Sequence, residues 1–322
     1  MMTGSKKMGM ATRDAYGAAI AALGHSDVRI VVVDADLSKS TKSNVFAKLF
    51  PDRFFNCGIA EANMVSVAAG LASCGKIPFA SSFASFLLCK AFDQLRMSVA
   101  NPGLNVKVVG SHAGISLGED GASQQSVEDI ALACALPRFV VLAPADEIAC
   151  QALVPLAAQH AGPVYLRTGR PKTPLVYAPE ETFQIGKAKT LIAGDDITLI
   201  ATGLMVYNAL EASDMLKTQG ISAAVMDIHT IKPLDDQSIV IAAQHTGAIV
   251  TIEEHLISGG LGSRVAHCLS QHHPTIQVSV GIEDTYAESG TWDALCTKYG
   301  LTPQHIVSAA LSALKQKKSF SR

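Results

Sequence analysis

The sequence predicts an α/β protein with two open, mostly parallel-sheet domains. Short β-branched runs alternate with longer segments whose apolar residues recur at the helical period, which is typical of βαβ units. The chain has 322 residues, which is enough for two domains. A single proline-rich stretch interrupts the alternation just past the middle of the chain, and we take it as the boundary between the domains.

The first predicted domain covers residues 1–180. Its strands are expected where β-branched residues cluster, and its helices where apolar residues recur every three to four positions. The predicted strands are 28–34, 77–81, 106–110, 139–142 and 164–167, and the predicted helices are 12–23, 61–73, 86–100, 127–136 and 147–159.

The connecting segment contains Pro171, Pro174 and Pro179, followed by the polar stretch 180–184. A second domain is predicted for residues 190–322, ending in a lysine-rich tail that we expect to be a solvated end. Its predicted strands are 197–201, 223–228, 248–253 and 277–280, and its predicted helices are 206–218, 236–244, 262–270 and 291–298.

Composition narrows the possible functions. The net charge of −2 gives no strong field for recruiting nucleic acid or an anionic membrane, so we expect small-molecule or protein partners instead. Apolar runs stay shorter than the roughly 18 residues of a membrane span, and the first ten residues contain no apolar stretch typical of a signal peptide. We therefore expect a cytoplasmic protein. With 48% hydrophobic and 17% charged residues, we expect other protein to cover much of its surface.

One cluster of histidines and a cysteine, within residues 267–273, has the residue types of a metal site. Imidazole and thiolate are zinc ligands, but the spacing fits no closed tetrahedral site, and a polar helix end before Pro274 is the simpler interpretation. We predict no metal site in this chain. The seven cysteines lie in apolar segments without C-x-x-C spacing and are predicted to be reduced. The cluster comprises His267, Cys268, His272 and His273.

Glu61 stands at the start of a predicted helix made almost wholly of small apolar residues. Such a helix is expected in a core or an interface. A carboxylate in its first turn has a simple explanation, because negative charge there is favoured by about 0.3–1 kcal/mol. The alternative is that Glu61 has a specific partner, since a buried carboxyl can share a proton with a heteroaromatic nitrogen of a ligand.

Residues 58–64 (GIAEANM) resemble the GIAEQNM segment of the transketolase family's pyrimidine-binding domain. The resemblance implies that Glu61 hydrogen-bonds the aminopyrimidine of thiamine diphosphate and activates that cofactor. In such enzymes the cofactor performs the carbanion chemistry, while protein groups position and tune it.

Residues 34–41 (DADLSKST) follow a predicted strand, where open α/β sheets place ligands. Alone, they read as a polar turn with capping residues. They resemble the family's DADLSxST loop, which implies that Asp36 faces the thiazolium side of the cofactor. The same match implies that Ser40 and the upstream Arg13 bind the substrate phosphate, for which the planar fork of arginine is suited.

Residues 82–96 (SFASFLLCKAFDQLR) contain aromatic residues that are core candidates on propensity alone. They resemble the family's FxxF…RAYDQIR segment, in which an aromatic ring stacks on the pyrimidine. We therefore expect Phe86, with Phe83 beside it, to bind the cofactor. Lys90 stands where the family often has Arg, and Cys89 where it often has Gly.

Residues 110–125 (GSHAGISLGEDGASQQ) form a long loop with four glycines, which favours a functional role. They resemble the family's SHxGxxxGEDGxTHQ loop. The resemblance implies that His112 and Asp120 contact the sugar hydroxyls and phosphate, with His112 counted as catalytic together with Glu61. It makes Glu119 a structural or proton-relay carboxylate. Gln124 replaces the histidine found in many members.

Arg170 follows a predicted strand and, on sequence alone, reads equally well as a solvated charge. It matches the family's second phosphate-binding arginine. Residues 198–203, 227–235 and 253–255, with the glycine-rich run 258–262, resemble the transketolase C-terminal domain. We expect that run to serve packing and assembly.

Thiamine enzymes hold the diphosphate through Mg²⁺ with a GDG motif and a downstream asparagine. This chain has no GDG, and its nearest matches are residues 119–121 and 194–196. The only asparagine after either match is Asn208, which lies at the wrong distance from both. We therefore expect a separate N-terminal subunit, carrying GDG…N, to hold the diphosphate and Mg²⁺, most simply in an α2β2 assembly. The expected reaction transfers a two-carbon ketol unit between sugar phosphates.

Three alternatives stay open. The chain has the length and domain order of a β subunit of a 2-oxo-acid dehydrogenase, although that subunit lacks this GEDG loop and the paired arginines. Deoxyxylulose-phosphate synthase is a second relative, but it normally carries both halves on one chain. A non-catalytic binding module of the same fold is the third alternative.

Overall fold

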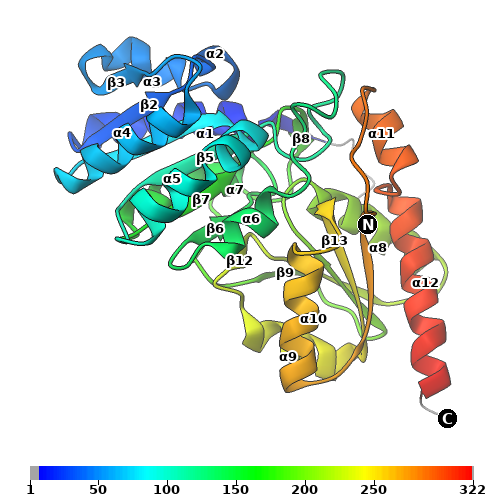
Figure 1. Ribbon diagram of the computed structural model, residues 1–322. Coiled ribbons are helices and arrows are strands. Elements are labelled where there is room, and N and C mark those ends of the chain that lie inside the picture. The colour runs from blue at the N-terminus through cyan, green and yellow to red at the C-terminus, as the bar shows by residue number, and fades with distance from the viewer. Residues whose placement is uncertain (1–6, 321–322) are drawn as a thin grey trace.

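A computed structural model describes residues 7–320 and shows two open sheets with helices packed on both faces (Figure 1), which confirms the predicted fold class. The first sheet has the strand order β12-β6-β7-β5-β4-β2-β3. Its strands are parallel except for β12, which is antiparallel to β6. They are β2 (Ile30–Asp34), β3 (Phe54–Asn56), β4 (Ile77–Phe83), β5 (Lys107–Ser111), β6 (Val140–Leu142), β7 (Val164–Arg167) and β12 (Thr230–Lys232).

Helices cover both faces of the first sheet because its strands are apolar on both sides. Val32 of β2 packs into the core that contains Tyr16 and Leu153, whereas its neighbour Val33 packs into the core that contains Met64. The helices are α1 (Thr12–Ser26), α2 (Ser38–Thr41), α3 (Asn44–Leu49), η1 (Pro51–Arg53), α4 (Glu61–Ser73), η2 (Phe86–Lys90), α5 (Phe92–Gln94), η3 (Leu95–Ala100), α6 (Asp129–Ala135) and α7 (Glu147–Gln159).

The second sheet has the order β14-β13-β10-β11-β9, with β9 antiparallel to β11 and the other strands parallel. A short antiparallel pair, β1 (Met8–Ala11) and β8 (Lys172–Pro174), joins the start of the chain to the connecting segment. The second-sheet strands are β9 (Lys189–Ile192), β10 (Ile197–Ala201), β11 (Ala223–Asp227), β13 (Ala248–Leu256) and β14 (Ile276–Ile282). The helices after the connecting segment are α8 (Met205–Thr218), α9 (Asp236–Thr246), α10 (Leu261–His272), α11 (Trp292–Lys298) and α12 (Pro303–Phe320).

The two sheets share apolar packing. Helices α8 and α12 cover one face of the second sheet, where Val206 and Ala310 lie in one core. On the other face, Ile239 of α9 and Leu261 of α10 belong to the same core as Met64 of α4. The two units therefore share one apolar core. Within residues 7–320, no helix combines the length and apolar character that a bilayer crossing requires.

Strand β12 lies after the predicted domain boundary yet pairs with β6 of the first sheet. Its three residues are too short to give a clear strand signal in the sequence. We propose that the division into residues 1–180 and 190–322 holds apart from this crossing strand. The ends of those two ranges, residues 1–6 and 321–322, lie outside the described residues.

Two predictions about helices were wrong in detail. The predicted helix 86–100 is divided into η2, α5 and η3, where π-helical turns replace a continuous α-helix. The predicted solvated tail is largely the end of α12, where Lys315 and Lys318 are exposed as expected but Lys317 is partly buried. There Lys317 donates to the carbonyl oxygens of Thr246 at 2.6 Å and Asp196 at 3.3 Å, which fastens the helix to the second sheet. Arg322, which was assigned to that tail, lies outside the described residues.

Tyr177 fastens the connecting segment to both units. Its hydroxyl donates to Asp227 Oδ2 at 2.6 Å, and its backbone N–H donates to Asp146 Oδ2 at 3.0 Å. Asp227 is fully buried, and its Oδ1 has no hydrogen-bond partner among residues 7–320. Burial, reinforced by the charge of Asp146, raises the pKa of Asp227 to about 7.

This raised pKa predicts a pH-dependent stability. An unfolded chain ionises aspartate near pH 4, so the stabilising contribution of Asp227 is complete below about pH 4 and is lost as the pH rises through about 7. Asp227→Asn cannot ionise and should escape this loss. Its free energy of unfolding relative to the wild type should therefore increase by roughly 4 kcal/mol between pH 4 and pH 8.

Denaturant titrations at the two pH values measure this difference. The control is Asp214→Asn, which changes an exposed aspartate of the same unit and should follow the wild type at both pH values. If Asp227→Asn also follows the wild type, Asp227 is not the titrating group.

Candidate active site

The residues that the sequence singled out collect at the carboxyl-terminal edge of the first sheet. Open α/β sheets bind ligands at this edge. Glu61 opens α4 after β3, and Arg13 of α1 is fixed nearby because its backbone N–H donates to Gly169 O at 3.4 Å. The ends of β2, β4, β5 and β7, with the loops that follow them, carry Asp36 and Ser40, Phe83 and Phe86, His112 and Asp120, and Arg170, respectively.

Glu61 is nearly buried at the first position of α4, with 3% of its side chain exposed. The helix dipole favours a negative charge at this end. Both carboxylate oxygens accept from Lys90 Nζ, at 3.5 Å for Oε1 and 3.4 Å for Oε2. The Lys90 side chain is half-exposed, and its ammonium group lies 4.2 Å from the centre of the Phe86 ring. Glu61 is therefore paired with a cation that solvent can reach.

A row of three rings runs from the Glu61–Lys90 pair to His112 along the carboxyl-terminal edge of the first sheet. The rings of Phe83 and Phe86 stack with centroids 5.5 Å apart and an interplanar angle of 18°. The Phe83 ring also stacks on the imidazole of His112, with centroids 4.0 Å apart. Because Phe83 is buried between its two neighbours, a further planar ring could stack only at the Phe86 end of the row.

His112 is held as a neutral imidazole. Its Nε2 lies 2.8 Å from Arg13 Nη1, and because a guanidinium group can only donate, Nε2 accepts. The ring proton is therefore on Nδ1, which donates to Ser111 Oγ at 2.8 Å. Burial, followed by the positive charges of Arg13, Arg170 and Lys42, lowers the pKa of His112 to about 3. The imidazole is uncharged at neutral pH.

Arg13 is oriented by two acceptors and keeps one donor free. Its Nη1 also donates to the backbone carbonyl of Ser40 at 3.3 Å, so the candidate residues Arg13, Ser40 and His112 do come together. Its Nε is buried and has no hydrogen-bond partner within residues 7–320. A buried guanidinium donor without an acceptor fits an anionic ligand.

Arg170 lies at the more exposed side of the cluster formed by Arg13, Ser40 and His112. Its Nη1 donates to Leu117 O at 2.5 Å in the loop of residues 112–127, which we call the site loop. It also lies 3.5 Å from Glu119 Oε2 and 3.9 Å from Asp120 Oδ2. Burial, followed by the positive charge of Arg170, lowers the pKa of Arg13, so the two arginines lie close enough to repel each other.

Asp36 is brought to the same edge but not into this chain of contacts. It is exposed, has a positive φ of 66°, and exchanges hydrogen bonds of 3.1 Å with the side chain of Asn56. The loop is organised instead by buried Asp34, which accepts from Leu37 N–H at 2.7 Å, Thr41 Oγ1 at 3.0 Å and Ser43 Oγ at 2.9 Å.

Sequence reasoning missed the roles of three residues. Asp34 was read only as part of a motif, although carboxylates followed by threonine and serine commonly organise turns. Lys90 was noted only as a departure from the family pattern, and its contact with Glu61 spans 29 positions of the chain. Ser111 directly precedes His112, and this adjacency was the only available signal for its hydrogen bond to the ring.

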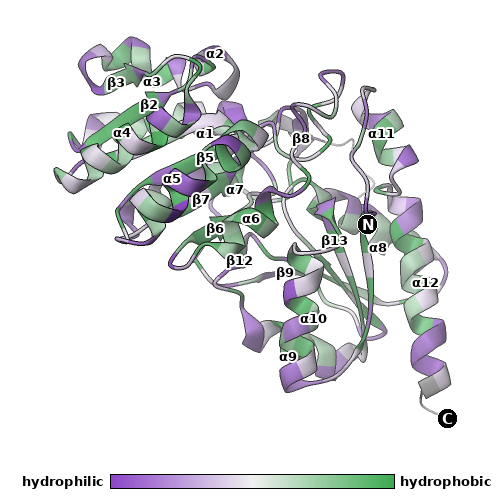
Figure 2. Ribbon diagram, in the orientation of Figure 1, coloured by the Kyte–Doolittle hydropathy of each residue, from purple (hydrophilic) through white to green (hydrophobic). Residues whose placement is uncertain are grey.

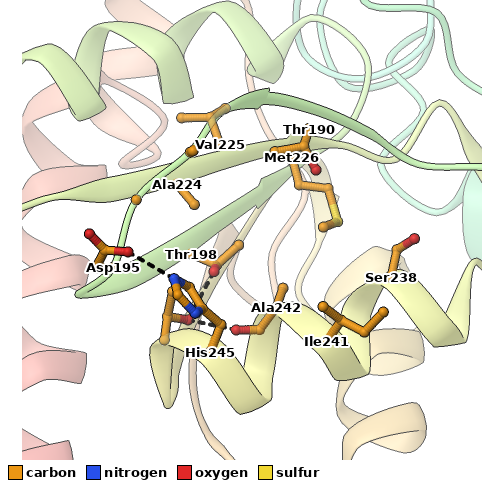
Figure 3. A pocket seen from close by; sticks show the side chains of 13 residues that line it. Thr190, Asp195, Thr198, Ala224, Val225, Met226, Ser238, Ile241, Ala242 and His245 are labelled. Carbon is orange, nitrogen blue, oxygen red and sulfur yellow. Dashed lines mark hydrogen bonds and ion pairs between the residues drawn. The ribbon is translucent and has the colours of Figure 1, made fainter.

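Other parts of the described chain offer weaker sites. Residues 7–320 contain no group of three or more His, Cys, Asp or Glu side chains that could hold a metal ion. A cavity of about 270 Å³ lies between β9–β11 and α9 (Figure 3). Its wall includes Met226 and Ile241, and its Asp195 and His245 pair with each other at 2.8 Å. No residue singled out from the sequence as catalytic or ligand-binding lines it.

Two family models match this chain. Residues 8–175 match the family model "Transketolase, pyrimidine binding domain", and residues 186–306 match "Transketolase, C-terminal domain". A "Putative transketolase C-terminal section" from Methanocaldococcus jannaschii is 45% identical over 94% of this chain and 96% of its own length. A "6-deoxy-6-sulfo-D-fructose transketolase subunit SqwH" from Clostridium sp. (strain MSTE9) is 41% identical over 95% of each chain.

A solved structure described as "Split gene transketolase, inactive beta4 tetramer" is 50% identical, with a TM-score of 0.91 over 96% of this chain and all of that one. Against other curated relatives, the chain spans about half of their length, 48% to 50%. With both of its parts matched, this chain belongs to the transketolase family and consists of that family's pyrimidine-binding and C-terminal domains.

Proposed function

We propose that this chain is the C-terminal subunit of a two-component transketolase, which transfers a two-carbon ketol unit between sugar phosphates with thiamine diphosphate. The observation that carries the proposal is the unbroken row of contacts from Glu61 through Lys90, Phe86 and Phe83 to His112 and Arg13. A carboxylate, stacked rings, a neutral imidazole and paired arginines are the groups that a heteroaromatic cofactor and a phosphorylated sugar require.

The residues near Glu61 fit the pyrimidine end of thiamine diphosphate. When bound, this cofactor supplies the nucleophilic carbon that adds to a ketose carbonyl. Glu61 would hydrogen-bond a pyrimidine ring nitrogen, and Phe86 would stack on the ring with the face that Lys90 now covers. Phe83 would support Phe86 from behind. The half-exposed Lys90 would move aside to admit the pyrimidine ring. Asp36, exposed at the same edge, would face the thiazolium side.

The arginines suit the phosphate of the sugar. Arg13 Nε is a buried donor without an acceptor among the described residues, and Arg170 with Asp120 lies at the more exposed side. An anion bound by Arg13, Arg170 and Ser40 would relieve the repulsion between the two guanidinium groups. If Arg13 turns toward this anion, His112 Nε2 becomes free to accept a proton from a substrate hydroxyl.

We propose that a partner subunit holds the diphosphate and Mg²⁺ and completes the site in an α2β2 assembly. Helix α4 supports this, because Figure 2 shows it mostly pale to hydrophobic, yet Asn63, Ser66 and Gly70 are exposed. Ile59, just before it, is 79% exposed. The sequence predicted burial for this helix, and a partner would provide it. The related solved chain, described as an inactive tetramer of β chains, fits a subunit that does not act alone.

A second candidate substrate is a sulfonated ketose, which the name of the Clostridium relative suggests. Sulfonate and phosphate both present three oxygens to an arginine fork. Two arginines around one site favour the more highly charged phosphate, so we keep sugar phosphates as the first proposal.

Glu61→Gln should lower the turnover of the assembled enzyme by roughly 100-fold or more, because an amide cannot exchange a proton with the ring nitrogen. Steady-state assays with the partner subunit, thiamine diphosphate and Mg²⁺ measure it. The matched control is Glu147→Gln, which also changes a glutamate at the first position of a helix of the first unit. Near-normal turnover of the Glu61 variant would rule out the role assigned to Glu61.

Arg170→Gln should raise KM for a phosphorylated donor roughly 10- to 100-fold and leave the KM of the unphosphorylated ketose unchanged, because a charge-assisted hydrogen bond is lost. Arg29→Gln is the control, since Arg29 is exposed and precedes the opposite end of β2. Comparing phosphorylated and sulfonated donors identifies the preferred anion. Equal losses with and without the phosphate would contradict the assignment.

Gly70→Arg should block association with the partner while the chain still folds. A Cβ atom added at Gly70 meets nothing within 4 Å in the part of the chain from residue 7 to residue 320, so a side chain there would project from the exposed face of α4. Sedimentation and circular dichroism measure assembly and folding, and Ser312→Arg on the exposed face of α12 is the control. Normal assembly of the Gly70 variant would exclude this face as the interface.

A further inference from the structure

Strand β13 carries two consecutive glutamates to which the proposed mechanism gives no role. Glu253 and Glu254 are each 1% exposed, and successive side chains of a strand point to opposite faces. Glu253 accepts from the backbone N–H groups of Leu261 at 2.7 Å and Gly262 at 2.8 Å, so it holds the start of α10. Glu254 points the other way, toward the first unit.

Glu254 contacts the first half of the site loop directly. Its Oε1 accepts from the backbone N–H of Ser116 at 2.5 Å. A Cβ atom added at Gly114 would lie only 2.2 Å from the same oxygen, and Gly114 has a positive φ of 73°. The loop backbone therefore packs against this carboxylate at a distance that only glycine allows.

The end of β13 also holds the second half of the site loop. The backbone N–H of Leu256 donates to Val127 O at 2.8 Å, and Gln125 Nε2 donates to Glu288 O at 3.1 Å. Both ends of the loop that carries His112 and Asp120 are thus held by the second unit. At the first end the contact is made by the side chain of Glu254.

The other oxygen of Glu254 faces a small void. Oε2 of Glu254 and Oγ1 of Thr168 are buried without hydrogen-bond partners in residues 7–320. Both residues line a void of about 10 Å³ beside Arg167, close to the smallest volume that holds a water molecule. Thr168 lies two residues before Arg170, and its carbonyl accepts from Ala113 N–H at 3.3 Å. The void therefore lies between β13 and the two segments that carry His112 and Arg170.

We propose that Glu254 is a positioning residue through which the second unit fixes the site loop, with one water bound between Glu254 Oε2 and Thr168 Oγ1. The inference rests on the proposed function only in its effect on the reaction, because the loop carries the groups assigned to the sugar. The contact itself belongs to the chain alone.

The test compares Glu254→Leu, which has no acceptor, with Glu254→Gln, whose Oε1 can still accept from Ser116. Hydrogen–deuterium exchange of residues 113–121 in the full chain should rise about tenfold in the leucine variant and stay within about twofold of wild type in the glutamine variant. The matched control Glu253→Gln should instead raise exchange at the start of α10. With the partner present, Glu254→Leu should raise KM for the donor about tenfold, with a smaller fall in kcat because the loop also carries His112.

Wild-type exchange of the site loop in Glu254→Leu would overturn the proposal, as would a fall in kcat with unchanged KM. If Glu254→Leu does not fold, Thr168→Val decides, with an expected rise of about threefold in loop exchange and wild-type exchange as the overturning result. If loop exchange responds as expected but the wild-type complex has no transketolase activity, the proposed function fails while the positioning contact stands.

Discussion

The buried ion pair between Arg167 and Asp129 joins the parts of the molecule on which the candidate site depends. Arg167 ends β7 and donates to both oxygens of Asp129 in α6, at 2.8 and 3.2 Å, while Tyr165 also donates to Asp129 at 2.7 Å. The same guanidinium group donates to the carbonyl of Glu254 in β13 at 2.8 Å. Losing one partner would leave a buried charge unpaired, which typically costs about 3–5 kcal/mol. The relative position of the two sheets at the site loop is therefore strongly constrained.

Positive charge gathers around His112 at one end of the candidate site. Arg13, Arg170 and Lys42 surround a neutral imidazole, and their positive charges reinforce the effect of burial on His112. Lys42 is paired with Asp14, and Arg170 lies near Glu119, but Arg13 Nε is buried without an acceptor in residues 7–320. That donor is more easily explained by an anionic ligand than by folding. Glu61 lies at the other end of the aromatic row, where it pairs with Lys90.

Much of the fold was predictable because its signals are local. β2 and β4 are short β-branched or apolar runs, and α4 and α7 are longer segments rich in alanine and other apolar residues, so their class followed from the sequence. Strand β12 was not predictable, because three residues pair with a strand far along the chain. The candidate residues were found by resemblance rather than by spacing. Their hydrogen bonds, such as Arg13 to His112 across 99 positions, depend on tertiary structure alone.

The site is already organised in the single chain, and this bears on how a partner would act. Asp36 and His112 both have positive φ, a conformation that typically costs about 1–3 kcal/mol for a residue other than glycine. The three hydrogen bonds to Asp34 and the two to the His112 ring hold these conformations. A partner would then not need to order the loops on binding, so less of its binding free energy would be lost to entropy. The change that cofactor binding would require is local, because Lys90 is half-exposed and can move away from Glu61 without disturbing the core.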